Sequence, residues 1–227
     1  MPDTPQLLAF VMAGLLLNLT PGVDVFYVVS NALRQGVRAG IVAGLGIAAG
    51  CMVHTLAAAL GISALIAASA TAFTVLKWVG AAYLLWMGWG MLRSRGSLDA
   101  EAFAGGALAP AQALPLRVVF GRGFLTNVLN PKVALFFLAF LPQFIAPGTA
   151  HPAWVFLALG LLFNVNGLLV SAGWALAAAV IARRLRAGGP STPPAAARGL
   201  LWVERAAGLL ILVFGLKLAL TEAPTGR

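Results

Sequence analysis

The sequence predicts an all-α integral membrane protein whose six transmembrane helices form two inverted three-helix repeats. Its 227 residues are 61% hydrophobic and only 9% charged, with a mean hydropathy of +0.95. This composition is typical of a chain that lies in a bilayer, and not of a soluble domain. Several apolar stretches reach the roughly 20 residues that a helix needs to cross ~30 Å of hydrocarbon. In each half the first long apolar run is interrupted by a proline, Pro21 or Pro131.

The apolar stretches define six expected spans. They are residues 5–30, 39–68, 72–92, 118–146, 152–182 and 200–220. They divide the chain into a first repeat (1–92), a cytoplasmic linker of small and polar residues (93–117) and a second repeat (118–227), which together form one membrane domain. Three spans in each half oblige the second copy to enter the membrane from the opposite side, which is the condition for an inverted repeat.

The basic residues predict the orientation of these spans. Arginines lie in the first, third and fifth loops, for example Arg34, Arg93 and Arg183, whereas the second and fourth loops contain no Lys or Arg. By the positive-inside rule the basic loops face the cytoplasm and both termini lie outside. A net charge of +9 would suggest nucleic acid in a soluble protein. Here aromatic side chains do not alternate with the basic ones, and we expect no nucleic-acid partner.

The first expected span contains polar residues that do not suit a simple anchor. Charges buried at membrane depth usually face a protein interior or a water-filled cavity. Thr20 suits the cap of a helix and Pro21 its first residue, which predicts that the helix breaks and restarts within the membrane. The candidate residues for substrate binding or coupling in this segment are Asn18, Thr20, Pro21, Gly22 and Asp24.

The second expected span is rich in glycine. Gly36, Gly40 and Gly44 share one helical face, which could serve a homodimer or the core of the fold itself. His54, further along, is either a proton carrier or a hydrogen-bonded core residue, and we retain it as a secondary site residue. Cys51 is the only cysteine, so no disulfide and no thiolate metal cluster is expected. The sequence predicts no cofactor and no metal site.

The fourth expected span repeats the pattern of the first. Asn130 is a candidate helix cap, Pro131 follows it, and Lys132 brings a charge of opposite sign to Asp24. Paired, proline-interrupted spans in corresponding halves indicate the binding site of a transporter. Two helix N-termini that meet near the midplane favour an anion such as a carboxylate. The candidate residues here are Asn127, Asn130, Pro131 and Lys132.

We expect Asp24 and Lys132 to pair across the repeat interface when the site is empty. A zwitterionic amino acid would then replace the pair, and protonation of Asp24 would provide a route to coupling. Asn164 and Asn166 of the fifth span complete the secondary set, where their side chains either line a cavity or hold helices together. No HExxH, GxSxG or His/Asp/Glu cluster is present, so the sequence does not predict an enzyme.

Three features resemble the LysE/RhtB family of amino-acid exporters over essentially the whole chain. They are the motif Thr20-Pro21-Gly22-Val23-Asp24, the glycine-rich second span, and the run NVLNPKVALFFLAFLPQF at residues 127–144. The resemblance implies a bacterial inner-membrane protein that exports small amino acids or related metabolites, driven by the proton-motive force or an ion gradient. The family usually has Pro after the glycine of the first motif, whereas this chain has Val23.

The alternative is a cation transporter or channel built on a similar inverted repeat. Cation selectivity would need several carboxylates or rings of carbonyls. Asp24 is the only carboxylate deep in a span, and Lys132 opposes a cation. We therefore favour a small-molecule substrate, with membrane lipid and a second copy of the chain as the other expected partners.

Overall fold

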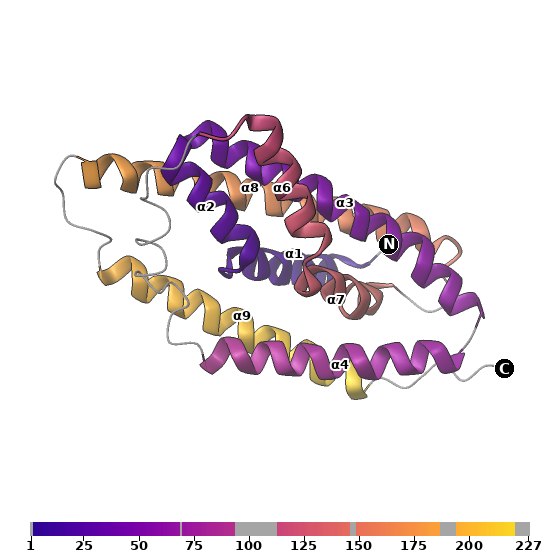
Figure 1. Ribbon diagram of the computed structural model, residues 1–227. Helices are drawn as coiled ribbons and strands as arrows, with labels where there is room; N and C mark the ends of the chain where they lie inside the picture. The colour runs from indigo at the N-terminus through magenta and orange to yellow at the C-terminus, as the bar shows by residue number, and fades with distance from the viewer. Residues whose placement is uncertain (1, 69, 94–112, 146–148, 187–193, 221–227) are drawn as a thin grey trace.

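A computed structural model describes residues 2–68, 70–93, 113–145, 149–186 and 194–220, and this part of the chain is helical without strands. Figure 1 shows its helices in one elongated bundle. They are α1 (Thr4–Leu19), α2 (Val23–Gln35), α3 (Val37–Ala68), α4 (Ala70–Arg93), α6 (Leu116–Val128), α7 (Pro131–Ala139), the 3-10 helix η1 (Leu141–Phe144), α8 (Pro152–Arg186) and α9 (Pro194–Leu220). The predicted all-α class is confirmed.

Within the described residues, two to four elements qualify as membrane spans. Val37–Gly61 of α3 and Pro152–Arg183 of α8 are long and apolar enough to cross a bilayer by themselves. The pair α1–α2, and α6 with the segment Lys132–Phe144, qualify if each bent pair counts as one span. Each pair is bent by 54° at its break. The predicted interruptions of spans one and four are therefore present, and six spans remain a prediction.

The breaks fall at slightly different residues from those predicted. The second helix of the first pair begins at Val23 and not at Pro21, so the expected restart at Pro21 is wrong. Helix α6 begins at Leu116, which takes two residues from the predicted linker 93–117. Residues 94–112 of that linker lie outside the described part. The remaining helices extend a few residues beyond the predicted spans.

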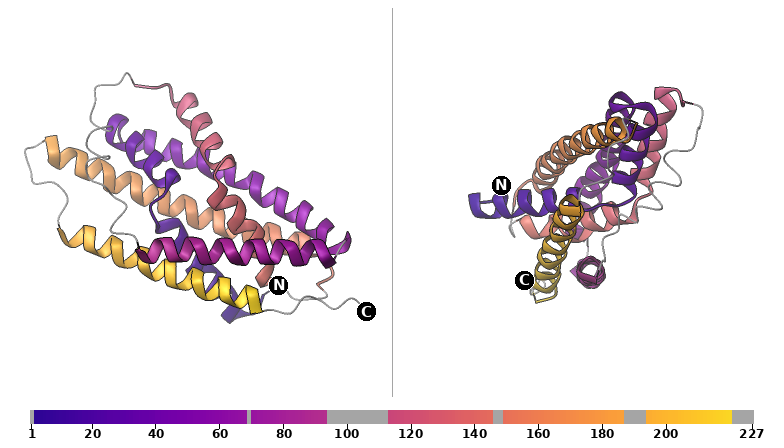
Figure 2. Two further views of the ribbon diagram at one scale, coloured as in Figure 1. Left: turned by 60° about the horizontal axis from the view of Figure 1, so that its bottom comes forward. Right: turned by 90° about the vertical axis from the view of Figure 1, so that its left-hand side faces the viewer.

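Helices α3 and α8 contact each other in the middle of the bundle. Helix α6 packs along α3, and α2 contacts both α3 and α8. Helices α4 and α9 contact each other along one side, as Figures 1 and 2 show, and they reach the rest of the bundle mainly through α1 and α7. The contacts α3–α8 and α4–α9 each join a helix of the N-terminal half of the chain to a helix of the C-terminal half.

Small residues allow these close contacts. A Cβ atom added to Gly40 would lie 2.7 Å from Cβ of Ala175, and one added to Gly44 would lie 3.0 Å from Cβ of Ser171. Both glycines therefore pack against α8 within the chain. Gly36 has φ of +86° at the turn from α2 to α3, a conformation that glycine adopts without strain.

The charged ends of the helices gather at one end of the bundle. Helices α2, α4 and α8 end there and α6 begins there, whereas α1 begins and α9 ends at the opposite end (Figure 1). Arg34, Arg93, Arg117 and Arg183 thus lie near the same end. This arrangement agrees with the sequence pattern, in which loops that contain arginine alternate with loops that contain no Lys or Arg. The face of the membrane that each end meets remains a prediction.

A cluster of seven aromatic rings fills the core on the α1–α7 side of the breaks. Ring centroids of Phe136 and Phe140 lie 4.6 Å apart, and Phe214 of α9 meets Phe140 edge-on at 4.6 Å. The cluster members are Phe10, Phe136, Phe137, Phe140, Phe144, Phe163 and Phe214. Stacked and edge-on rings add stabilisation beyond their buried area. The cluster joins α1, α7, α8 and α9 into one packed unit.

Candidate functional site

The first break leaves the start of α2 without a side-chain cap. Three residues separate α1 from α2, and Gly22 is the N-cap of α2. The hydroxyl of Thr20 donates to the carbonyl of Leu16 at 2.7 Å, back into α1. The predicted capping of α2 by Thr20 is therefore wrong. The first turn of α2 carries Asp24, and its N–H groups are not occupied by a side chain.

The second break is capped as predicted. Asn130 is the N-cap of α7, and its Oδ1 accepts a hydrogen bond of 3.0 Å from the backbone N–H of Lys132. Pro131 is the first residue of α7, where its missing N–H costs no hydrogen bond. The Nε2 of His54 donates to the carbonyl of Asn127 at 2.9 Å, which ties the end of α6 to α3.

The two breaks meet at the carboxylate of Asp24. Its Oδ2 accepts hydrogen bonds from Nδ2 of Asn127 at 2.9 Å and from Nδ2 of Asn130 at 3.1 Å. These partners lie 103 and 106 residues away in the sequence. The positive charge of Lys132 also acts on this carboxylate. The Nζ of Lys132 lies 3.5 Å from the carbonyl of Leu17, at the end of α1.

Three polar atoms around Asp24 are buried without a hydrogen-bond partner among the described residues. They are Oδ1 of Asp24, Oδ1 of Asn127 and Nδ2 of Asn18. A buried polar group left unpaired costs about 1–3 kcal/mol. A ligand that bonds all three atoms would remove this cost. Two of the atoms are acceptors and one is a donor, so the ligand must carry both kinds of group.

A cavity of about 60 Å³ joins these groups. A water molecule needs roughly 10–15 Å³ by the same measure, so the cavity has room for a few waters or a small polar solute. Of the predicted site residues, Asn18, Thr20, Gly22, Asp24, Asn127, Asn130, Lys132 and Asn164 line it. Pro21 and Pro131 lie in the adjoining backbone of the breaks. His54 and Asn166 are not among its lining residues.

Helices α3 and α8 supply lining residues that were not predicted. They include Gly44, Cys51, Phe163, Gly167 and Ser171. A Cβ atom on Gly167 would lie 3.3 Å from Oδ1 of Asn18, so glycine keeps α8 close to the first break. Asn164, Gly167 and Ser171 follow one another at spacings of three and four residues, which places them on one face of α8. Asn164 both lines the cavity and donates to the carbonyl of Ala48 at 2.9 Å, so both of its predicted roles are present.

The broken helices and the cavity between them indicate a class of protein. Two bent helix pairs of membrane length enclose a small polar site where their breaks meet, which is the arrangement of a membrane transporter. The chain belongs to the LysE type translocator family, whose family model matches residues 15–222.

Curated relatives agree with this assignment. The chain is 36% identical over 180 residues to an uncharacterised membrane protein of Vibrio cholerae, covering 79% of this chain and 83% of the relative. It is 30% identical over 211 residues to a homoserine/homoserine lactone efflux protein of Salmonella typhimurium, covering 93% and 94%. It is 28% identical over 177 residues to a leucine efflux protein of Enterobacter, covering 78% and 81%. No solved structure matches the chain.

Proposed function

We propose that this protein exports small amino acids or related metabolites from the bacterial cytoplasm through the cavity between its two helix breaks. The observation that most directly supports this proposal is the set of unpaired polar atoms around Asp24. The acceptors Oδ1 of Asp24 and Oδ1 of Asn127 suit an ammonium group. Nδ2 of Asn18, Lys132 and the uncapped first turn of α2 suit a carboxylate.

The names of two relatives support this choice of substrate. They describe efflux of homoserine or its lactone and of leucine. A cavity of about 60 Å³ suits a small cargo better than a bulky one in this conformation. A substrate with a larger side chain would fit only if α2, α6 or α8 moved. Such helix movements are expected of a transporter when its site closes to one face of the membrane and opens to the other.

Six spans in an inverted repeat are part of the proposal. In this proposal α4, with 24 residues, and α9, with 27 residues, are the third and sixth spans. Helix α3 contacts α8, and α4 contacts α9, so each meets its counterpart from the other half. Contacts between counterparts are expected of elements that lie beside a twofold axis. In this topology the basic end of the bundle faces the cytoplasm and both termini lie outside.

The orientation is tested with single cysteines in a Cys51→Ala background. A cysteine that replaces Ser97 should react only with a membrane-permeant reagent in intact cells, and one that replaces Thr225 also with an impermeant reagent. The opposite result would reverse the direction of transport inferred here.

Transport itself is tested in proteoliposomes loaded with unlabelled leucine or homoserine. Exchange with labelled amino acid outside should occur without a gradient, and a pH gradient should drive net accumulation. Exchange that is indifferent to the pH gradient and to a protonophore would contradict proton coupling. The absence of exchange with any amino acid, together with flux of a cation, would overturn the proposed function.

A further inference from the structure

Arg122 is a charge within the fourth predicted span that the central site does not use. It lies six residues after Leu116, about 9 Å along α6. Its side chain is exposed, and the described residues include no carboxylate in an ion pair with it. An ionisable residue at such a depth normally has a partner or a function. The hydroxyl of Thr126 donates to the backbone carbonyl of Arg122 at 2.8 Å, and this bond does not involve the guanidinium.

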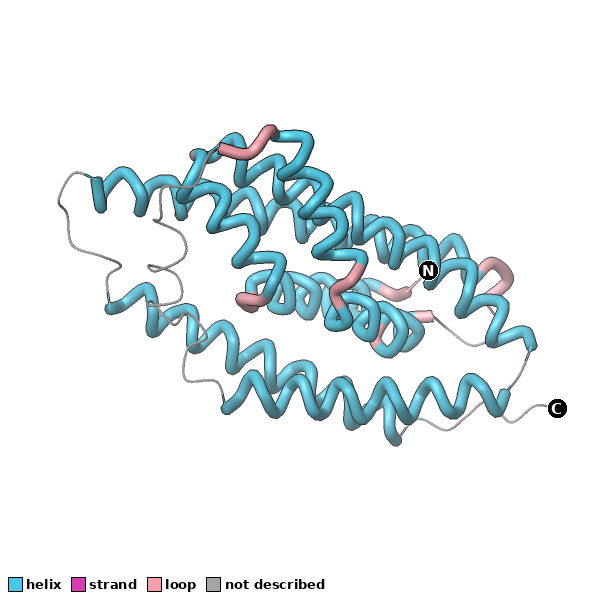
Figure 3. Tube along the Cα trace, in the orientation of Figure 1, coloured by secondary structure: helices cyan, strands magenta, loops and turns pink. Residues whose placement is uncertain are grey.

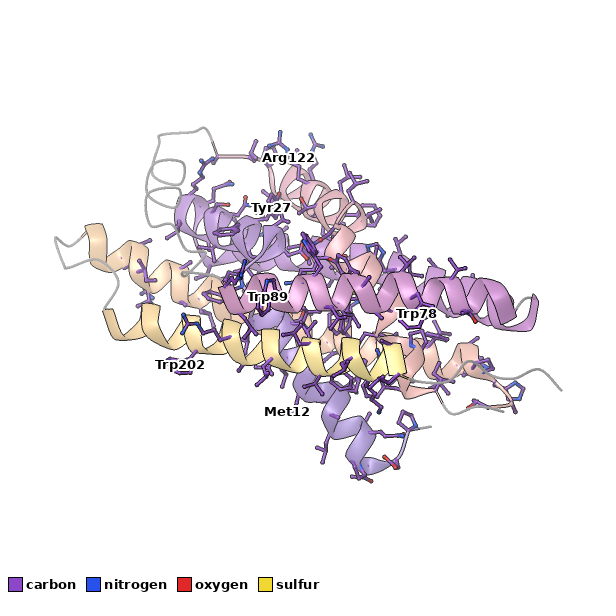
Figure 4. The ribbon with its side chains drawn as sticks, turned by 90° about the horizontal axis from the view of Figure 1, so that it is seen from below. Met12, Tyr27, Trp78, Trp89, Arg122 and Trp202 are labelled. Atoms are coloured by element: carbon purple, nitrogen blue, oxygen red, sulfur yellow. The ribbon has the colours of Figure 1, made fainter. Side chains whose placement is uncertain are left out.

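Arg122 lines a second cavity of about 270 Å³, at the basic end of the bundle. Its lining residues are Tyr27, Ser30, Asn31, Arg34, Gln35, Leu114 and Arg122, and none of them lines the cavity at Asp24. Figure 4 shows the side chains of Arg122 and Tyr27 on the same side of the bundle, on α6 and α2. Of the residues that the structure describes, two arginines and no carboxylate line this cavity, so it suits an anion.

The neutral polar groups of this cavity mostly bond the protein itself. The hydroxyl of Tyr27 donates to the carbonyl of Val119 at 2.8 Å, and Nδ2 of Asn31 donates to the carbonyl of Tyr27 at 2.8 Å. The hydroxyl of Ser30 donates to the carbonyl of Phe26 at 2.7 Å. These three donors therefore bond within the protein, and the charge that lines the cavity is the positive charge of Arg34 and Arg122. A guanidinium binds phosphate through two parallel hydrogen bonds.

An apolar strip continues from Arg122 along the same face of α6. Leu125 and Leu129 follow at the spacing i+3 and i+7, and their side chains are 54% and 75% exposed. Val23, at the start of α2, is 60% exposed. The strip from Arg122 to Leu129 is about 10 Å long. A ligand with an anionic head and an apolar chain fits both parts, whereas a water-soluble anion fits only the cavity.

We propose that the cavity at Arg122 and Arg34 binds the phosphate of an anionic phospholipid, whose acyl chain lies along Leu125 and Leu129. Basic pockets between transmembrane helices at the cytoplasmic side bind such headgroups. The lipid contacts α2 and α6 together, and these helices carry Asp24 and Asn127 of the central site. Binding therefore fixes the spacing of the two helices that lead into the breaks.

Lipid binding is measured on the full-length protein in detergent by native mass spectrometry and by thermal unfolding. Phosphatidylglycerol should remain bound and raise Tm, and phosphatidylcholine should not. Arg122→Gln should weaken phosphatidylglycerol binding about five- to tenfold, the loss expected for one arginine near a lipid phosphate. Arg122→Lys keeps the charge but loses the planar guanidinium, so its affinity for phosphatidylglycerol should lie between those of the unchanged protein and Arg122→Gln. This variant tests the site if Arg122→Gln does not fold.

Arg117→Gln is the matched control, because Arg117 is an exposed arginine on the same helix that does not line the cavity. It should bind phosphatidylglycerol as the unchanged protein does. Equal losses in both variants would show general surface attraction and overturn the site.

Inorganic phosphate and Leu125→Gln distinguish the two sources of the anion. Protection by inorganic phosphate equal to that by phosphatidylglycerol would overturn the lipid assignment in favour of a free anion. Leu125→Gln should weaken lipid binding without changing any effect of phosphate. The readout is binding alone, so its outcome does not depend on the proposed export.

Discussion

The two helix breaks bend the chain by the same 54° but use their polar residues in different ways. At the second break Asn130 satisfies the start of α7 with its Oδ1 and holds Asp24 with its Nδ2. At the first break Thr20 bonds back into α1, and no side chain caps α2. The second break therefore caps its own helix and supports Asp24, whereas the first leaves the start of α2 without a side-chain cap.

This difference shows that equal backbone geometry does not require equal chemistry. A proline and a bend recur in both halves, but the charges that follow have opposite signs. A carboxylate in the first turn of α2 is favoured by the helix dipole, and Lys132 in the first turn of α7 is not. Lys132 is compensated by the charge of Asp24 and by the carbonyl of Leu17. The sharpest tests change one break and leave the other intact.

The largest effect is expected for Asp24→Asn. The substitution keeps the volume but removes the charge that we assign to the substrate ammonium group. Losing one member of a buried charge pair costs about 2–5 kcal/mol, so the apparent affinity should fall at least about thirtyfold and active export should stop. Exchange assays in proteoliposomes measure this. Asp3→Asn is the control, because Asp3 caps α1 far from the cavity and Asn caps as well as Asp. Normal export by Asp24→Asn would refute the role of Asp24.

The next effect is expected for the exchange of charges, Asp24→Lys with Lys132→Asp. A simple ion pair would tolerate it. The amides of Asn127 and Asn130 donate toward position 24, however, and a lysine there would meet donors instead of acceptors. We expect the double variant to reach the membrane and to lack transport. Full transport would show that the pair only neutralises charge, and membrane fractionation with flux assays measures both properties.

A smaller effect separates the two functions of Asn130. Asn130→Ala removes the cap of α7, worth about 1 kcal/mol, together with one bond to Asp24. Asn130→Ser keeps a capping oxygen but is too short to replace the amide that reaches Asp24. Asn130→Ala should therefore have a lower Tm than Asn130→Ser in thermal unfolding. Both variants should transport less than the unchanged protein. Equal stability of Ala and Ser would contradict the capping role at the second break.

The smallest effect is expected for Thr20→Val at the first break. Valine has nearly the same shape, and the hydroxyl that it removes bonds only the carbonyl of Leu16, which also accepts the N–H of Thr20. We expect a change in stability below about 0.5 kcal/mol and transport within about twofold. A loss as large as that of Asn130→Ala would mean that Thr20 caps α2 in another conformation of the protein.

The sequence alone determined the all-α class, the two interrupted spans, the family resemblance and the cap at Asn130. These features depend on hydropathy over about 20 residues, or on neighbours within three positions, and such patterns are local. The same local rule failed at Thr20. Its hydroxyl could bond forward to α2 or back to α1, and the geometry of the break decides between them.

Only the tertiary structure decided which groups meet at Asp24. Its amide partners lie more than 100 residues away, and the side-chain atoms that remain unpaired depend on how every neighbour is engaged. Gly167 and Ser171 line the cavity because α8 crosses close to the first break, and Arg34 and Arg122 share a cavity because α2 lies beside α6. Helix packing brings these residues together, and no local pattern in the chain specifies the rotation and register with which two helices meet.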